Sequence, residues 1–346
     1  MKKAVHIFGA GLLSLVLLAG CVSKGLVSKP NDTALAVNKL KVVTSIYPMY
    51  EFTRQVGGDK VDVVNLVPPG VEPHTWEPTP KDMEAIAKAN LLVVNGGMES
   101  WLDKVMNSGS LKNVTVVEAG KGLERLPADE HDEEAHKADG HAEDDGHEED
   151  DNKAEAHQED AQEAGKEGHH HEYDPHFWVS PKQAKAEVEN IKQGLIAADP
   201  ANGEHYENNA KDYMDKLDAL DQEFREGLAG VQKKAFIVTH RAFAYLARDY
   251  GLQQIGIMGV NPETEPTPKT MAQIADFAKA HQVKYIFFEA LISPKLAEAI
   301  AKEAGAQTLV LNPLGGLTEE QLKAGKDYIA IQRENLSNLK KALNGE

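Results

Sequence analysis

Residues 235–250 read AFIVTHRAFAYLARDY, an apolar run followed by a histidine and then by apolar residues at helical spacing. Aromatic and β-branched residues fill 236–239, which predicts a short buried strand at 235–239. The spacing of apolar residues over 242–250 predicts a helix. A strand that passes directly into a helix is typical of a parallel sheet with helices on its faces. We therefore expect an α/β fold with His240 at the end of one strand.

The same alternation of strand and helix continues toward both ends of the chain. In the C-terminal half, further strands are expected at 254–258, 284–288 and 307–311, and helices at 270–281, 294–304 and 318–343. In the N-terminal half, strands are expected at 41–46, 61–67, 91–94 and 114–117, and helices at 49–56 and 81–89. A chain of 346 residues is longer than one hydrophobic core usually serves. We expect two lobes, at 39–180 and 230–346, each with a parallel β-sheet flanked by helices.

A long helix is predicted between the two lobes. Residues 201–228 carry large apolar side chains at intervals of mostly three and four residues: Tyr206, Tyr213, Leu217, Leu220 and Phe224. This spacing gives a helix one apolar face. With the helical segment that begins at Pro181, it forms a linking region at 181–229. We expect the helix to join the lobes rigidly and to leave a cleft between them.

Most of the negative charge lies in one insert, residues 129–172. The whole chain has a net charge of −18, and this insert holds 19 acidic residues against three lysines, so the rest is close to neutral. Nothing is basic enough to bind nucleic acid through its phosphates. The insert lacks apolar periodicity and is predicted to be disordered. It also contains eight histidines: His131, His136, His141, His147, His157, His169, His170 and His171. We expect it either to gather zinc weakly or to be a passive linker.

The N-terminus has the features of a bacterial lipoprotein signal. Residues 1–20 contain two early lysines, an apolar stretch shorter than a membrane span and small residues before Cys21, the only cysteine. The run LAGC at 18–21 resembles a lipobox, which implies cleavage before Cys21 and acylation of its thiol. Residues 21–38 then form a polar tether. The protein is expected outside the cytoplasm, anchored to the membrane by lipid.

Three histidines outside the insert are candidate metal ligands. His74 follows the strand at 61–67, His176 comes soon after the insert, and His240 ends the strand at 235–239. Ligands of open α/β sheets bind beyond the C-terminal ends of the strands. Neutral imidazole suits Zn²⁺ without any thiol. The intervals match no local zinc motif, so residue spacing alone predicts only a candidate site. His205 and His281 are expected on the surface.

Three motifs resemble the metal-ligand segments of the zinc and manganese solute-binding proteins of bacterial ABC importers. They are VEPHTWEPTP at 71–80, DPHFWVSP at 174–181 and THRAFAYL at 239–246. The resemblance runs from about Lys41 to the C-terminus, and the insert lies where zinc-specific members of the ZnuA type carry theirs. It implies two lobes bridged by a rigid helix, with the metal held between them by His74, His176 and His240.

The resemblance also bears on the metal and on the fourth ligand. Manganese members place a carboxylate at the third ligand position, where this chain has His240, so zinc is favoured. Many relatives supply Asp or Glu from the loop near 311–317, where this chain has Gly315 and Gly316. We expect a water molecule or Glu72 as the fourth ligand, and Glu289 less so. Trp76 and Trp178 are expected to pack around the site.

The function implied is capture of Zn²⁺ and its delivery to an ABC permease in the cytoplasmic membrane, by a monomer that is not an enzyme. A related protein that binds manganese or another divalent metal is the first alternative. A zinc hydrolase is a second, but the sequence has neither a His-Glu-x-x-His helix nor a Gly-x-Ser-x-Gly turn. A surface adhesin is a third, for which no particular partner is indicated.

Overall fold

The computed structural model describes residues 39–345, except for residue 110 and the segments 129–172 and 263–265. The predicted signal, Cys21, the tether and the His-rich insert with its predicted disorder lie outside these residues. Residues 39–346 cluster as one compact unit. In the part of the chain that is described, no helix combines the length and the apolar character needed to cross a membrane.

The first sheet contains four parallel strands in the order β2-β1-β3-β4. Its strands are β1 (Leu40–Thr44), β2 (Val61–Asn65), β3 (Leu91–Val94) and β4 (Thr115–Glu118), and its local helices are α1 (Tyr47–Gly57), α2 (Pro80–Ala87) and α3 (Leu102–Asn107). Short 3₁₀ turns lie at η1 (Gly58–Lys60) and η2 (Pro73–Thr75). Every residue of β3 is buried, because the strand lies inside the sheet and both of its faces are covered.

The second sheet repeats this arrangement, with parallel strands in the order β6-β5-β7-β8. The strands are β5 (Ala235–Val238), β6 (Gln253–Gly256), β7 (Tyr285–Phe288) and β8 (Gln307–Val310), and the helices between them are α6 (Ala244–Asp249), α7 (Pro268–Ala280) and α8 (Lys295–Ala304). In both sheets the second strand in sequence lies on one side of the first, and the third lies on the other side. The strand order therefore reverses between β1 and β3 and between β5 and β7. The predicted pair of α/β lobes is confirmed, with element bounds shifted by a few residues.

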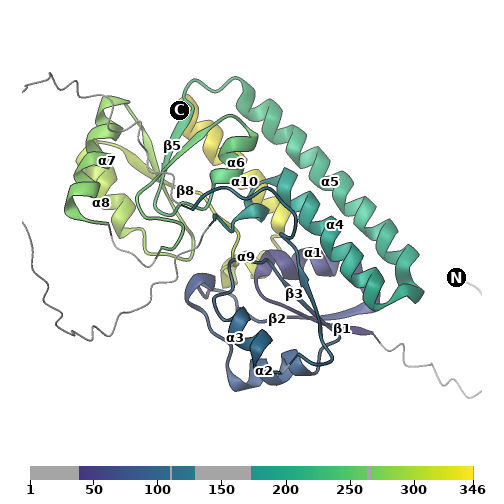
Figure 1. Ribbon diagram of the computed structural model, residues 1–346. Helices are drawn as coiled ribbons and strands as arrows, with labels where there is room; N and C mark the ends of the chain where they lie inside the picture. The colour runs from purple at the N-terminus through teal and green to yellow at the C-terminus, as the bar shows by residue number, and fades with distance from the viewer. Residues whose placement is uncertain (1–38, 110, 129–172, 263–265, 346) are drawn as a thin grey trace, which may run out of the picture. The chain divides into compact units, whose positions relative to one another are not determined.

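Two helices run side by side along the lobes, α4 (Pro181–Ala198) and α5 (Gly203–Ala229), as Figure 1 shows. The turns η4 (Phe177–Val179) and η5 (Pro200–Asn202) precede them. The predicted long helix is confirmed as α5, whose buried face is made by the predicted apolar residues. One hydrophobic core contains Phe52 of the first lobe, Phe224 of α5 and Phe287 of the second lobe. This shared core makes α5 a stiff connection.

The predicted C-terminal helix over 318–343 is wrong in one respect, because two helices form there. They are α9 (Glu319–Lys323) and α10 (Tyr328–Asn344). Gly325 between them has φ +67°, a left-handed conformation that ends the first helix. Asp327 then caps the second, accepting a hydrogen bond from the Ala330 N–H at 2.8 Å. Glycine followed by an N-cap residue is a stop-and-start signal that apolar periodicity alone does not detect.

Glu187 is an acid on the buried face of α4. Its side chain is fully buried, and neither carboxylate oxygen has a hydrogen-bond partner among the described residues. Burial raises the pKa of Glu187 well above 4.5, and the nearby carboxylate of Glu99 raises it further. A raised acid pKa means that the folded chain holds this proton more tightly than the unfolded chain does. Glu187 therefore costs stability as the pH rises above 4.5.

The variant Glu187→Gln should be more stable than the parent protein at neutral pH. Its advantage in free energy of unfolding should grow by up to about 1.4 kcal/mol per pH unit above the unfolded pKa, until the folded pKa is reached. Thermal unfolding of both proteins from pH 4 to pH 8 measures this difference. An advantage that stays constant with pH would mean that the amide improves packing rather than removing the cost of ionisation.

Candidate metal centre

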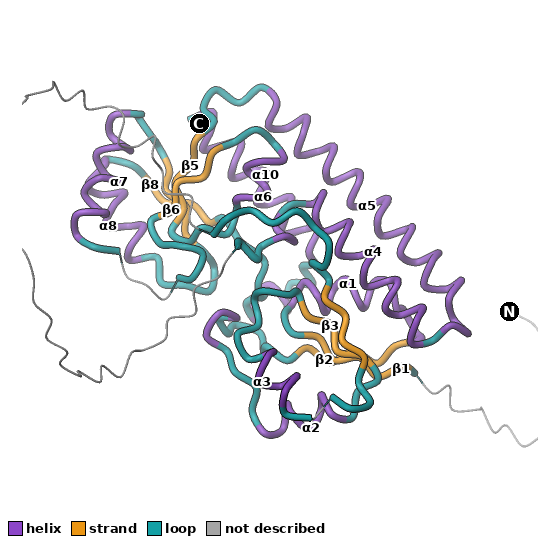
Figure 2. Tube along the Cα trace, viewed as in Figure 1, coloured by secondary structure: helices purple, strands orange, loops and turns teal. Residues whose placement is uncertain are grey.

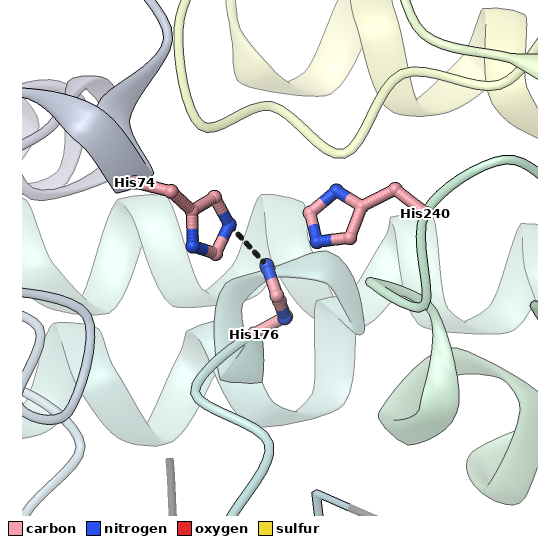
Figure 3. Close-up of side chains that lie close together, drawn as sticks. All are labelled: His74, His176 and His240. Atoms are coloured by element: carbon pink, nitrogen blue, oxygen red, sulfur yellow. Dashed lines mark hydrogen bonds between the residues drawn. The ribbon is translucent and has the colours of Figure 1, made fainter. Parts of the chain in front are cut away.

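The three predicted histidines come from separate loops, and the fold brings them together (Figure 3). His74 lies in η2, in the loop that follows β2, and the Glu72 carboxylate accepts its backbone N–H at 3.2 Å. His176 immediately precedes η4. His240 follows β5, and Glu289 follows the adjacent strand β7. Neighbouring parallel strands end at the same edge of a sheet, so these two side chains meet where the strand order reverses.

The spacing of the ring nitrogens suits one metal ion. The Nε2 atoms of His74 and His176 lie 3.2 Å apart. One ring nitrogen from each of the three histidines lies within 4.8 Å of the others. Zinc–nitrogen bonds of about 2.0–2.1 Å in a tetrahedron place ligand nitrogens roughly 3.3 Å apart. The first pair is therefore already at ligand spacing, and the third imidazole needs only a small movement.

Asp174 fixes the orientation of His176. Its Oδ1 lies 2.7 Å from the ring Nδ1 of His176 and accepts the backbone N–H of the same residue at 2.9 Å. Both side chains are almost fully buried. The Nδ1–H of His176 donates to the carboxylate. Nε2 then carries no proton, and its lone pair is directed toward His74. The segment 174–181 was predicted to carry a ligand, but this carboxylate's role was missed, although it lies only two residues before the histidine.

His240 has a hydrogen-bond acceptor at one ring nitrogen and a carboxylate close to the other. Nδ1 lies 2.8 Å from Glu289 Oε1, and Nε2 lies 2.9 Å from the carbonyl oxygen of Val260. Burial lowers the pKa of His240, but the Glu289 carboxylate and the Val260 carbonyl outweigh burial and raise it to about 9. The imidazole is therefore protonated on both ring nitrogens, and positively charged, at neutral pH when no metal is bound. Metal binding must displace one of these protons and the contact at its nitrogen.

The histidines line a cavity of about 10 Å³, enough for one atom-sized occupant. Glu72 and Glu289, the two predicted carboxylate candidates, also line it. Gly315 lies there too, and a Cβ added to it would come within 2.9 Å of the Pro73 ring. The glycine thus allows the loop at 311–317 to pack closely against the segment that carries His74.

Of the two histidines expected on the surface, His281 is exposed but His205 is half-buried, and both tryptophans pack as expected. The ring of His281 stacks on Phe277 at 3.9 Å, and that of His205 lies 3.5 Å from Asp59 and outside the cavity. Trp178 is fully buried, and its indole N–H donates to the Pro313 carbonyl at 2.6 Å. Trp76 packs against Trp101. Both tryptophans therefore support the loops around the histidines.

Fold and site together define a two-lobed α/β protein that holds three imidazoles around a single-ion cavity between its lobes. Its family follows from comparison with known proteins. The chain belongs to the family of ZnuA, the periplasmic component A of the zinc-uptake complex, whose model matches residues 42–342.

Individual relatives are similar over most of the chain. The zinc-binding lipoprotein AdcA of Streptococcus pneumoniae is 39% identical over 332 residues, which cover 96% of this chain but only 61% of that protein. The high-affinity zinc uptake system protein ZnuA of Bacillus subtilis is 40% identical over 88% of each chain. The crystal structure of the Zn(II)-bound ZnuA-like domain of the pneumococcal AdcA superposes with a TM-score of 0.70 at 36% identity, covering 88% of this chain and 99% of that one.

Proposed function

We propose that this protein captures Zn²⁺ outside the cytoplasm and delivers it to an ABC permease for zinc uptake. The observation that carries the proposal is the convergence of three ring nitrogens, within 4.8 Å of one another, from three separate loops. The relatives named for zinc binding and high-affinity zinc uptake support the choice of metal and of process. The two lobes, at 39–180 and 230–346, would each contribute ligands, so that binding draws them together.

His74, His176 and His240 are the proposed ligands, and zinc is preferred to manganese. Three nitrogen donors suit Zn²⁺, whereas Mn²⁺ favours carboxylate and water. Glu289 already faces His240 Nδ1 at 2.8 Å and orients that ring. We therefore assign the fourth position to a water molecule or to Glu72, rather than to Glu289. The metal is cargo, so its coordination needs to be tight but reversible.

The small cavity favours a binding protein over a hydrolase. A catalytic zinc ion needs an open coordination position and room beside it for the substrate. A cavity of about 10 Å³ has room for the ion but not for an organic molecule. Acylation of Cys21 would hold the protein at the membrane near its permease, and the histidines of the insert would gather zinc for the site.

A zinc competition titration on the protein without residues 129–172 tests the proposal. Pro127 and Tyr173 pair as an antiparallel bridge, so the two ends left by this deletion lie side by side. We expect tight binding of one Zn²⁺ per chain and much weaker binding of Mn²⁺. Weak zinc binding after the deletion would place the main site in the insert and contradict the proposed ligands. Zinc uptake by cells at limiting zinc then tests the insert separately.

The variant Asp174→Asn should weaken zinc binding by about 10- to 100-fold, the usual cost of losing a carboxylate that orients a ligating histidine. Asparagine keeps the shape of the side chain and an acceptor oxygen, but it loses the negative charge that stabilises the proton on His176 Nδ1. Competition titration against a chelator of known affinity measures the change. Asp218→Asn is the control, because Asp218 is an exposed partner of Lys185. Equal losses in both variants would indicate a general effect of charge instead.

A further inference from the structure

A buried tyrosine of the second lobe, Tyr245, contacts the segment that carries His176. Tyr245 lies in α6, the helix that follows His240, and its side chain is fully buried. Its hydroxyl donates to the backbone carbonyl oxygen of Asp174 at 2.7 Å and accepts the backbone N–H of Leu126 at 3.1 Å. The hydroxyl therefore acts as donor and acceptor at once, and both of its partners are backbone groups of the first lobe.

These contacts fix the backbone of Asp174. Its N–H donates to the Leu126 carbonyl oxygen at 2.8 Å, and its own carbonyl accepts the Tyr245 hydroxyl. The carboxylate of the same residue lies 2.7 Å from His176 Nδ1. A carboxylate can orient a ligating imidazole only when its own position is fixed by neighbouring contacts. The Tyr245 hydroxyl therefore acts on His176 through Asp174.

The segment around His176 is held from both lobes. On the first lobe, the side-chain amide of Asn95 donates to the Pro175 carbonyl oxygen at 2.9 Å. On the second lobe, the ring of Tyr245 packs against Phe177, with ring centroids 4.7 Å apart. Tyr245 therefore contacts the chain on both sides of His176, through its hydroxyl before the histidine and through its ring after it.

The other end of α6 is attached to the beginning of α4. Asp249 Oδ2 accepts the Ser180 hydroxyl at 2.7 Å and the Gln183 side-chain amide at 2.8 Å. Asp249 lies one helical turn after Tyr245, so α6 is fixed to the segment 174–183 at two points. Because α6 closely follows His240 in the chain, a movement of this helix displaces both sides of the metal centre together.

We infer that Tyr245 is a positioning residue of the metal centre, which couples the loop of His240 to His176 through the backbone of Asp174. The inference rests on the proposed capture of zinc, because it explains how ligands from two lobes are held in place together. Phenylalanine would leave two backbone groups without this hydrogen bond. Its ring would still pack against Phe177, so Tyr245→Phe removes the positioning contact and keeps the packing.

The variant Tyr245→Phe should bind zinc about tenfold more weakly than the parent, in the high-affinity step of a chelator-competition titration of the full chain. Tyr206→Phe is the matched control, because Tyr206 is equally buried and its hydroxyl donates to Asp199 at 2.8 Å, outside the cavity. The double variant with Asp174→Asn completes a cycle. It should lose little more affinity than Asp174→Asn alone, since both residues act through His176. Additive losses would make the role of Tyr245 merely structural and overturn the inference.

The Nδ1–H of His176 gives a readout that a general loss of stability would not move. Its NMR signal in the metal-free protein is assigned by its absence in His176→Gln. This signal should shift in Tyr245→Phe and keep its position in Tyr206→Phe, because only the first hydroxyl contacts Asp174. Unchanged zinc affinity and an unshifted signal in folded Tyr245→Phe would overturn the inference. Absence of tight zinc binding in the parent would instead contradict the proposed function itself.

Amide hydrogen exchange of the parent protein provides the test if Tyr245→Phe does not fold. Zinc binding should slow exchange of the Leu126 N–H, because that group donates to the Tyr245 hydroxyl. The N–H of Asn202, which donates to the Asp199 carbonyl in a turn away from the cavity, is the control and should exchange at an unchanged rate. Exchange at Leu126 that does not respond to zinc would overturn the inference.

Discussion

Replacing His240 with alanine should lower zinc affinity by about 1,000-fold or more. Structural zinc sites gain about 10–16 kcal/mol from their ligands, so the loss of one nitrogen costs several kcal/mol, and each 1.4 kcal/mol is tenfold. His240 is the strongest test, because it is the proposed ligand that lies on the second lobe. Without it, His74 and His176 remain 3.2 Å apart as a two-nitrogen site on the first lobe. The variant should therefore bind zinc weakly.

The experiment uses chelator competition on the protein without residues 129–172, so that the histidines of the insert do not mask the loss. His281→Ala is the matched control, because His281 is an exposed imidazole stacked on Phe277 and lies outside the cavity. Thermal unfolding of each metal-free protein shows whether the variant is folded. Unchanged zinc affinity in a folded His240→Ala protein would contradict the three-histidine site.

Much of this fold can be predicted from local sequence. Runs such as 91–94 and 235–239 are too apolar for a solvent-facing sheet, and their alternation with helices requires parallel strands. The order of strands within each sheet was not predicted, because it depends on packing between elements distant in sequence. The break at Gly325 was missed for a different reason: it is a local backbone signal inside a segment whose apolar spacing otherwise suits one helix.

The convergence of the three candidate histidines was predictable, but their supporting contacts were not. His74 and His176 are 102 residues apart, so in the sequence only the rule for strand ends and the family resemblance relate them. Asp174 and the Val260 carbonyl act on the imidazoles through precise geometry, which spacing does not encode. Glu289 was predicted as a minor ligand candidate, and its distance from His240 Nδ1 instead favours an orienting role.

Zinc affinity should rise steeply with pH because of that contact. In the metal-free protein the pKa of His240 is lowered by burial but raised more by Glu289, to about 9. Zinc must therefore displace a proton from His240 at any pH below about 9, and each pH unit below that value costs up to about tenfold in affinity. Between pH 6.5 and pH 8.5 we expect an increase of about 100-fold. Calorimetry in buffers with different ionisation enthalpies should detect about one released proton at neutral pH.

The variant Glu289→Gln separates this proton from the general effect of pH on zinc binding. Glutamine removes the negative charge that raises the His240 pKa, so the pH dependence above the ordinary histidine value of 6.5 should flatten. The metal-free protein gives an independent check. A histidine pKa raised on folding stabilises the fold fully below pH 6.5, and this stability is lost as the pH rises through about 9. The metal-free parent should therefore lose up to about 3 kcal/mol across that interval, whereas the variant should not. Parallel pH profiles of parent and variant, in both zinc affinity and stability, would show that Glu289 does not hold the proton on His240.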